Sequence, residues 1–279
     1  MTPRSALIDP FSLDGQVAVV TGGTGRLGSQ YARALLSAGA AVALFDVATP
    51  GPIVRELLDA DALMSSHLVD TTDRAAVDRA MDEVVTRFGA PTILINNAGL
   101  ASSPADAGLA TARFEHYPAK AWDAMMESHL KSALLVSQAF LVTFRAAKRD
   151  AGSIINVSST YGVVSPDQSM YERQRLGGQE WFKPVGYSVA KSGMLNFTRW
   201  LAEYCAHERL GVRVNTLVPG GVREDGHSPE FVAEYEKRTP LGRMAREDDY
   251  NGAVVFLASQ ASAYMTGAML VVDGGWTAR

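Results

Sequence analysis

Along the chain, segments of continuous apolar residues alternate with segments in which apolar residues recur at helical spacing. This alternation predicts strands and helices in turn. Continuous apolar runs at 17–23, 41–46 and 91–99 are typical of strands that are buried on both faces of a sheet. The stretches 26–40 and 73–89 instead place apolar residues at helical spacing, and the first of them stops near a glycine, a common helix terminator. Strands that alternate with helices call for a parallel sheet covered by helices on both faces.

The second half of the chain continues the alternation. Long helices are expected at 121–149 and from 185 to about 207. Further elements are expected at 53–60, 65–70, 152–159, 212–221, 247–259 and 268–275. Because the sequence contains no internal repeat, low-complexity tract or linker, we expect a single α/β domain over residues 1–279, with a doubly wound parallel sheet of about seven strands.

The composition limits the classes of partner. The chain has 279 residues, of which 47% are hydrophobic and 20% charged, an ordinary balance for a globular protein. Its net charge of -4 and its pI near 5.8 argue against nucleic acid or a membrane as the main partner. Cys205 is the single cysteine, so no internal disulfide forms and a reducing compartment is expected. With no signal-like start and no apolar run of ~18–20 residues, we expect a cytoplasmic protein.

A glycine-rich turn, TGGTGRLG at 21–28, joins the first expected strand to the first expected helix. Its Gly-x-Gly-x-x-Gly spacing suits a dinucleotide, because a pyrophosphate approaches the backbone only where no Cβ intervenes, and the helix N-terminus then offers N–H groups. Asp46 closes the second strand 18 residues after Gly28, where a carboxylate can accept both hydroxyls of an adenosine ribose. This predicts a Rossmann-like sheet that binds NAD. A cation at Arg26 favours NADP instead, and a merely structural tight turn is the remaining alternative.

The segment VGYSVAKSGM places Tyr187 and Lys191 four residues apart at the start of the helix expected from 185, so both lie on one face. A phenol with a pKa near 10 is a poor base at neutral pH, and an adjacent cation would lower that pKa. The alternative is a surface pair of the kind that Tyr171 and Arg175 also form by spacing.

Six motifs occur in order: TGGTGRLG, NNAG, INVSS, YSVAK, VNTLVPGG and MTGAMLVVDGG. With them, residues 13–276 resemble the short-chain dehydrogenase/reductase family in its short, single-domain branch. The resemblance implies an NAD-dependent oxidoreductase, with NADP less favoured, that transfers a hydride between nicotinamide and a secondary alcohol or ketone. It also implies a small-molecule substrate, a homodimer or homotetramer, and no metal.

Matched onto this chain, the family's acid/base is Tyr187, its tuning cation is Lys191 and the residue that orients the substrate oxygen is Ser159. Lys191 also holds the nicotinamide ribose in this family. The resemblance and the glycine turn together give the following expected cofactor-binding residues: Gly22, Gly25, Arg26, Leu27, Gly28, Asp46, Asp70, Thr71, Asn97, Ala98, Gly99, Tyr187, Lys191, Pro219, Gly220 and Val222.

Two side chains depart from the family pattern. Arg26 stands where the shorter members have a glycine, giving a turn more typical of the long, nucleotide-sugar branch. His129 stands seven residues after Trp122, where the family often has an asparagine that holds a water for proton relay. An imidazole titrates near neutrality and can hold that water through either nitrogen, so we expect His129 to serve catalysis. The alternative is a histidine that only packs against the sheet.

Two segments also depart from the family. Between Ser159 and Tyr187 lie 27 residues, 160–186, about twice the usual gap, and such long loops are usually functional. They contain four candidates for contact with substrate or a second subunit: Tyr171, Arg173, Arg175 and Trp181. The stretch 221–242 is expected to form a substrate lid, with Glu224 in place of the family's threonine and Arg223 able to meet an anion.

A weaker resemblance, to members annotated with bacterial surface-sugar and flagellin-modification pathways, favours a small polar, sugar-derived substrate. Three alternatives remain: an NADP-dependent reductase of the 3-oxoacyl type, a cofactor-retaining sugar epimerase or dehydratase, and a non-catalytic dinucleotide-binding protein.

Overall fold

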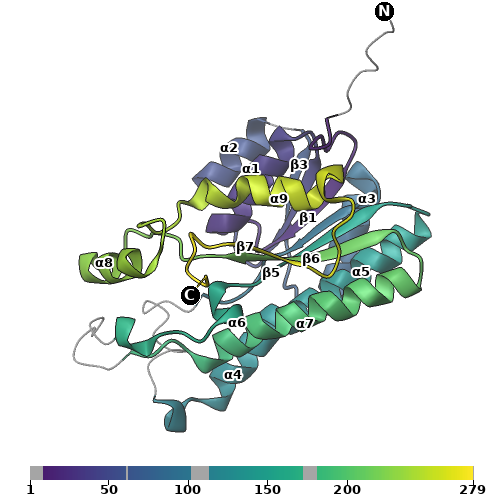
Figure 1. The fold of residues 1–279 in the computed structure, drawn as a ribbon. Coiled ribbons are helices and arrows are strands. Elements are labelled where there is room, and N and C mark those ends of the chain that lie inside the picture. Colours follow the sequence, from purple (N-terminus) through teal and green to yellow (C-terminus); the bar gives the residue numbers. More distant parts are fainter. Residues whose placement is uncertain (1–8, 61, 102–112, 172–180, 279) are drawn as a thin grey trace, which may run out of the picture.

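Seven parallel strands form one sheet in the computed structural model, which describes residues 9–60, 62–101, 113–171 and 181–278 (Figure 1). The strand order is β3-β2-β1-β4-β5-β6-β7. The strands are β1 Val17–Thr21, β2 Ala41–Asp46, β3 Met64–Leu68, β4 Ile93–Asn96, β5 Gly152–Val157, β6 Val212–Pro219 and β7 Met269–Val272. The winding reverses between β1 and β4, which opens a crevice at the carboxyl ends of the central strands. The predicted Rossmann-like, doubly wound sheet is confirmed.

Helices cover both faces of the sheet. They are α1 Arg26–Ser37, α2 Pro52–Ala60, α3 Arg74–Phe88, α4 Ala119–Met126, α5 Ser132–Ala146, α6 Thr160–Val163, α7 Val185–His207, α8 Pro229–Arg238 and α9 Asn251–Ala258. Alternate residues of β1 enter two separate cores, because successive strand side chains point to opposite faces. Val19 packs in the core formed with α3, α5 and α7, whereas Val20 packs in the core formed with α1, α2 and α9.

The structure shortens several expected strands. Those expected at 65–70, 152–159 and 268–275 are Met64–Leu68, Gly152–Val157 and Met269–Val272. The strands predicted to reach 23 and 99 end at Thr21 and Asn96. Gly22 turns the chain out of β1 with a φ of +60°, a conformation that glycine adopts without strain.

The helix expected at 121–149 is likewise not continuous. It consists of α4, a π-helical turn Glu127–Lys131, and α5. The extra residue in this turn leaves no glycine or proline signal, and its buried centre is His129. Turns of this kind are frequent at functional sites.

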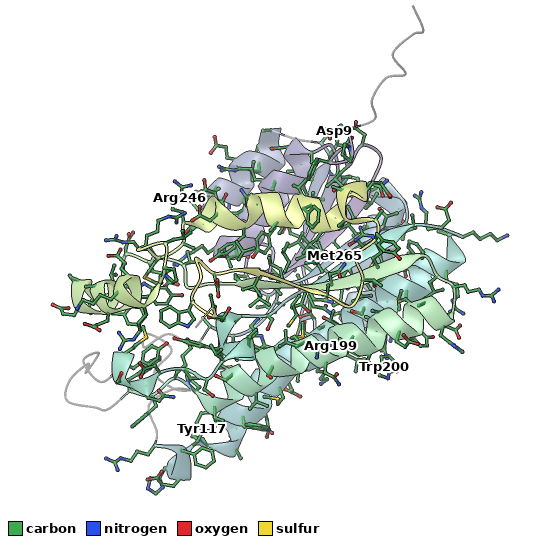
Figure 2. All side chains as sticks on the ribbon, in the orientation of Figure 1. Asp9, Tyr117, Arg199, Trp200, Arg246 and Met265 are labelled. Carbon is green, nitrogen blue, oxygen red and sulfur yellow. The ribbon has the colours of Figure 1, made fainter. Side chains whose placement is uncertain are left out.

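The outer surface of α7 is partly apolar. Trp200 lies on the outward side of this helix and is 61% exposed (Figure 2). Among the described residues, no helix is both long enough and apolar enough to cross a bilayer.

Candidate active site

A cleft of about 450 Å³ lies at the carboxyl ends of the strands, at the crevice that the reversal of winding creates. It gathers predicted residues from segments far apart in the chain. Those that line it are Arg26, Leu27, Asn97, Gly99, His129, Ser159, Tyr187, Lys191, Pro219, Gly220 and Val222. The other predicted residues lie outside this lining: Gly22, Gly25, Gly28, Asp46, Asp70, Thr71 and Ala98.

Ser159, Tyr187 and Lys191 come together because β5 delivers its carboxyl end against the first turns of α7. Ser159 caps α6, and its Oγ accepts a hydrogen bond of 3.2 Å from the Tyr161 backbone N–H. Lys191 is buried, donates from Nζ to the Val157 carbonyl at 2.9 Å, and lies 5.9 Å from the centre of the Tyr187 ring. A Cβ at Gly162 would crowd the Lys191 carbonyl, so this glycine permits α6 to approach α7 closely.

Burial has the largest effect on the pKa values of Tyr187 and Lys191. The Tyr187 ring keeps some exposure to the cleft, but the protein around it removes enough water to raise its pKa, and hydrogen bonding to Ser159 opposes that rise. Burial also lowers the pKa of Lys191 to about 8. The expectation that Lys191 gives Tyr187 a lowered pKa is therefore wrong for the protein alone, because desolvation has the larger effect on the phenol.

His129 enters the same cleft from the π-helical turn. Its ring lies edge-on to Tyr187 with 5.7 Å between ring centres, and any side chain at Gly99 would overlap it. The ring is buried, and neither nitrogen has a partner at full hydrogen-bond geometry among the described residues, although the Leu100 backbone lies close enough to favour the protonated ring. Burial, and then the charge of Lys191, hold its pKa well below the usual 6.5. The expectation that His129 titrates near neutrality is wrong, and the imidazole presents one donor and one acceptor instead.

The glycine turn is shaped for an anion. Asn97 donates from Nδ2 to the carbonyls of Thr21 and Gly22 at 3.1 and 3.2 Å, which holds the turn against β4. A Cβ at Gly28 would overlap the Gly22 carbonyl. The N-cap of α1 is Gly25, and no side chain caps the first turn of this helix. Its N–H groups therefore fit a pyrophosphate, as the sequence predicted for a dinucleotide.

Asp46 lies at the end of β2 as predicted, but its carboxylate already accepts local hydrogen bonds. Oδ2 accepts from the backbone N–H and hydroxyl of Thr24 at 2.9 and 2.7 Å, and Oδ1 accepts from the Ala48 N–H at 3.0 Å. Asp46 thus also fixes the glycine turn. Two carboxylate oxygens offer about four acceptor positions, so capacity for a ribose remains.

Arg26 points toward the loop after β6. Its guanidinium pairs with Glu224 at 2.7 Å and with Glu247 at 3.1 Å. The sequence suggested a phosphate contact for Arg26 and did not foresee these partners, which lie about two hundred residues away in the chain.

The remaining predicted cofactor residues make mainly structural contacts. Asp70 accepts from the backbone and side chain of Thr72, and these hydrogen bonds lower its pKa. Thr71 is buried and accepts from the Ser132 hydroxyl at 2.7 Å. The Ala98 N–H donates to the Thr21 hydroxyl at 3.0 Å.

The described parts of the 160–186 insertion pack against the expected lid. Tyr171 lies between Trp181 and Phe231 of α8, with ring centres 4.5 and 5.7 Å away. Asp167 pairs with Arg238 of α8 at 3.3 Å. Tyr171, Trp181 and Phe231 belong to one buried, largely aromatic cluster.

Of the candidate arginines in these segments, the structure describes only Arg223. Arg173 and Arg175 lie outside the described residues. Arg223 is 67% exposed, reaches Glu236 at 4.0 Å, and does not line the cleft.

Sequence reasoning missed Lys183, which lines the cleft beside Tyr187. Its Nζ lies 4.8 Å from the centre of the Tyr187 ring. The available signal was its position just before Pro184, the N-cap of α7.

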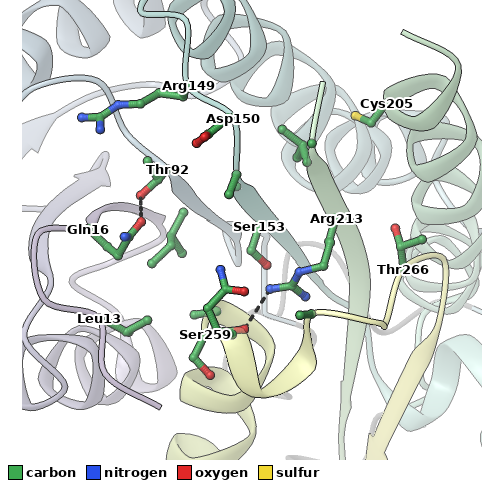
Figure 3. A pocket seen from close by; sticks show the side chains of 18 of the residues that line it. Leu13, Gln16, Thr92, Arg149, Asp150, Ser153, Cys205, Arg213, Ser259 and Thr266 are labelled. Carbon is green, nitrogen blue, oxygen red and sulfur yellow. Dashed lines mark hydrogen bonds between the residues drawn. The ribbon is translucent and has the colours of Figure 1, made fainter. Parts of the chain in front are cut away.

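A second hollow, of about 560 Å³, lies around the amino ends of β5 and β6 (Figure 3). Arg213 spans it by donating to the carbonyls of Leu257 and Ser259, both at 3.1 Å. It contains none of the predicted site residues. Although it is larger, we place the active site in the cleft at the carboxyl ends.

Comparisons with known proteins find relatives that match nearly the whole chain. A family profile described as Enoyl-(Acyl carrier protein) reductase matches residues 25–277. Cis-4-hydroxycyclohexanecarboxylate dehydrogenase of Sinomonas cyclohexanicum is 34% identical over 267 residues, covering 94% of this chain and 97% of that protein. D-threitol dehydrogenase of Mycolicibacterium smegmatis is 34% identical over 274 residues, covering 96% and 95%.

Solved structures match over nearly the full length. A short chain dehydrogenase from Leptospira borgpetersenii with bound NAD+ has a TM-score of 0.82 and 30% identity, covering 95% of this chain and 94% of that one. A gluconate 5-dehydrogenase from Burkholderia cenocepacia in complex with NADP and tartrate has a TM-score of 0.81 and 30% identity, covering 97% and 98%.

Proposed function

The chain belongs to the short-chain dehydrogenase/reductase family and is an NAD(P)-dependent oxidoreductase, and from this premise we propose that it oxidises or reduces a small hydroxylated substrate with NAD as its partner. The observation that carries the proposal is the meeting of Ser159, Tyr187 and Lys191 in one cleft beside the glycine turn. The relatives' names include a hydroxy acid and a polyol, which supports a secondary alcohol or ketone as the reacting group.

The residues present fit a nicotinamide dinucleotide. The uncapped first turn of α1 would hold the pyrophosphate, Asp46 the adenosine ribose and Lys191 the nicotinamide ribose. When bound, the nicotinamide supplies or accepts the hydride. Asp46 favours NAD because a 2′-phosphate would lie against its carboxylate.

Side chains of the protein would bind the reacting oxygen of the substrate and transfer its proton. Ser159 Oγ accepts from the Tyr161 N–H and is hydrogen-bonded to Tyr187, so the serine would hold the substrate oxygen beside the phenol. Tyr187 is protonated at neutral pH and would give its proton to the substrate oxygen in reduction. In oxidation only its deprotonated form, the minor form at this pH, would accept the proton of the substrate hydroxyl. The neutral His129 offers its ring nitrogens to a water that connects this group with solvent.

Tyr187→Phe tests the proposal, because it removes the proton donor and leaves the ring in place. We expect turnover to fall at least ~10³-fold while NAD still raises the melting temperature. Lasting formation of NADH on addition of substrate also separates a dehydrogenase from a cofactor-retaining epimerase. Wild-type turnover in this variant would overturn the assignment of Tyr187.

We also propose that the protein is a homo-oligomer through α5 and α7. A groove of about 580 Å³ between these helices is lined by apolar side chains that include Leu134, Phe197 and Trp200. Exposed apolar surface of this kind marks interaction sites.

A further inference from the structure

Building on the proposed function, we propose that an ionic bridge between Arg26 and Glu224 closes one side of the dinucleotide crevice and slows release of the cofactor. Arg26 is the first residue of α1, and Glu224 belongs to the loop that connects β6 to α8. Arg26 replaces a glycine of the family pattern and Glu224 a threonine, and the structure brings these two departures together. Both are positioning residues, because they act on the cofactor by holding this loop and not at the reacting atoms.

The ionic bridge joins two segments that line the cleft. Arg26 and Leu27 line it from the start of α1, and Val222 and Glu224 line it from the loop after β6. Arg26 Nη1 lies 2.7 Å from Glu224 Oε1, and the two side chains are 38% and 40% exposed. Because α1 begins at Arg26, the pair lies at the uncapped end of the helix to which we assign the pyrophosphate. A dinucleotide bound there would have the ion pair beside its pyrophosphate.

The backbone around Glu224 places its carboxylate for this contact. Val222 pairs with Ala245 in a short parallel bridge, and Glu224 and Glu247 each follow that bridge by two residues. Both carboxylates contact Arg26, whose Nε lies 3.1 Å from Glu247 Oε1. A guanidinium carries five N–H groups, so Arg26 keeps capacity for a phosphate oxygen while it is paired with both carboxylates. Binding of a pyrophosphate therefore does not require the bridge to break.

Beyond the parallel bridge, the loop forms a turn that is bonded to itself. The Glu224 N–H donates to His227 Nδ1 at 3.2 Å, and the His227 N–H donates to the Glu224 carbonyl at 3.1 Å. The His227 ring in turn lies 4.9 Å from the ring of Phe231 in α8. The Glu224 side chain thus connects this turn, and with it the start of α8, to the glycine turn that would hold the cofactor.

The charge of Glu224 taken alone predicts the opposite effect on release. A pyrophosphate is an anion, so removal of a carboxylate beside it would relieve repulsion and slow release. If Glu224 competed with the pyrophosphate for Arg26, its removal would also slow release. The bridge predicts faster release, because the loop is then no longer held to α1. The sign of the change therefore distinguishes these explanations.

The test measures the rate of NADH release by stopped-flow fluorescence with excess NAD+ as the competitor, and it needs no substrate. Glu224→Gln should raise this rate about 5-fold, near the upper range for a partly exposed ion pair. In an Arg26→Met background the same substitution should not raise the rate, because no bridge remains to be broken. Glu236→Gln is the matched control and should keep the wild-type rate, because this partly exposed carboxylate of α8 pairs with Arg223 outside the cleft.

Two results would overturn the proposal. One is release from Glu224→Gln at or below the wild-type rate, and the other is an equal increase in the Arg26→Met background. In either case the dehydrogenase function stands. If the wild-type protein binds neither NAD(H) nor NADP(H) in thermal-shift titrations, the proposed function itself fails.

Discussion

His129 shows how burial changes what a side chain can do. A solvent-exposed imidazole would titrate near pH 6.5, but this one is enclosed beside Lys191 and stays neutral through the working range. Its ring nitrogens are therefore suited to donating and accepting hydrogen bonds with a water rather than to carrying a positive charge. An asparagine, with one acceptor and one donor group, offers the same chemistry.

We therefore predict that His129→Asn keeps kcat within ~5-fold and leaves the pH–rate profile unchanged, whereas His129→Leu lowers kcat ~10²-fold. Gly99→Ala should resemble the leucine variant, because its methyl group would displace the imidazole. Steady-state kinetics with NAD binding as the control would measure this. Equal activity of the leucine and asparagine variants would leave His129 with a packing role only.

The buried charge of Lys191 is expected to lower the free energy of unfolding at neutral pH. Its pKa is about 8 in the folded protein and near 10.4 unfolded, so between these values the unfolded chain binds more protons and stability rises with pH. Lys191→Met removes the buried charge but leaves the Val157 carbonyl without its donor. We expect the variant to gain about 1–2 kcal/mol in free energy of unfolding at pH 7 and to lose turnover.

The gain in free energy of unfolding of Lys191→Met over the wild type should shrink as the pH rises from 8 to 10. Over this range the lysine of the folded wild-type protein becomes neutral. Denaturant melts at pH 7, 8.5 and 10 would measure it. Lys131→Met, at an exposed lysine of the π-helical turn, is the matched control. A Lys191→Met variant that is destabilised equally at all three pH values would contradict the argument.

At the scale of elements, aromatic side chains join the described residues of the insertion to α8. The Asp167–Arg238 pair is half exposed, and such pairs contribute ~0–1 kcal/mol. Tyr171 is 3% exposed and contacts both Trp181 and Phe231, so its loss opens a cavity.

Tyr171→Ala should therefore raise the substrate KM at least ~10-fold and lower the melting temperature, with NAD affinity unchanged. Asp167→Ala should change stability by less than ~1 kcal/mol. Kinetics and thermal melts of the two variants compare the aromatic and ionic links directly. A larger effect of Asp167→Ala would reverse this ranking.

The sequence predicts what depends on local pattern. The strands Val17–Thr21 and Ala41–Asp46 follow from uninterrupted apolar runs, and the proximity of Tyr187 to Ser159 follows from a motif order that a parallel sheet brings to one edge. The π-helical turn could not be predicted, because one extra residue in an amphipathic helix leaves its polar pattern nearly unchanged. The partners of Arg26 depend on contacts between segments far apart in the chain, which periodicity does not record.

At the scale of the whole molecule, the proposed preference for NAD over NADP rests on the carboxylate of Asp46 at the end of β2. We predict that NAD, at 100 times its dissociation constant, adds about 2.7 kcal/mol of stability, and that NADP at equal concentration adds less. Thermal-shift titrations with NAD, NADH, NADP and NADPH would measure this.

Asp46→Asn should narrow the preference for NAD at least ~10-fold, because it removes the repulsion of a 2′-phosphate. Thr24→Val, which removes a hydrogen bond to Asp46 but no charge, should weaken both cofactors alike. A wild-type preference for NADP would overturn the assignment to Asp46.

The apolar groove between α5 and α7, which Leu134, Phe197 and Trp200 help to line, predicts that copies of the chain associate through these helices. Trp200→Glu should yield a smaller species by light scattering than the wild type, because a charge at the centre of an apolar contact is costly. Leu68→Glu, at an exposed position 72% accessible on β3, is the control and should keep the wild-type mass. An unchanged mass for Trp200→Glu would exclude the groove between α5 and α7 as the contact between subunits.

The pairing of Arg26 with Glu224 and Glu247 also limits how this sequence can evolve. A change of Arg26 to glycine alone would leave the Glu224 and Glu247 carboxylates without their arginine partner, beside the turn at which we propose that the pyrophosphate binds, so such a lineage would lose cofactor affinity. A neutral residue at 224 or 247 has to arrive first or at the same time. Among descendants of this chain, the three positions should therefore change as a group.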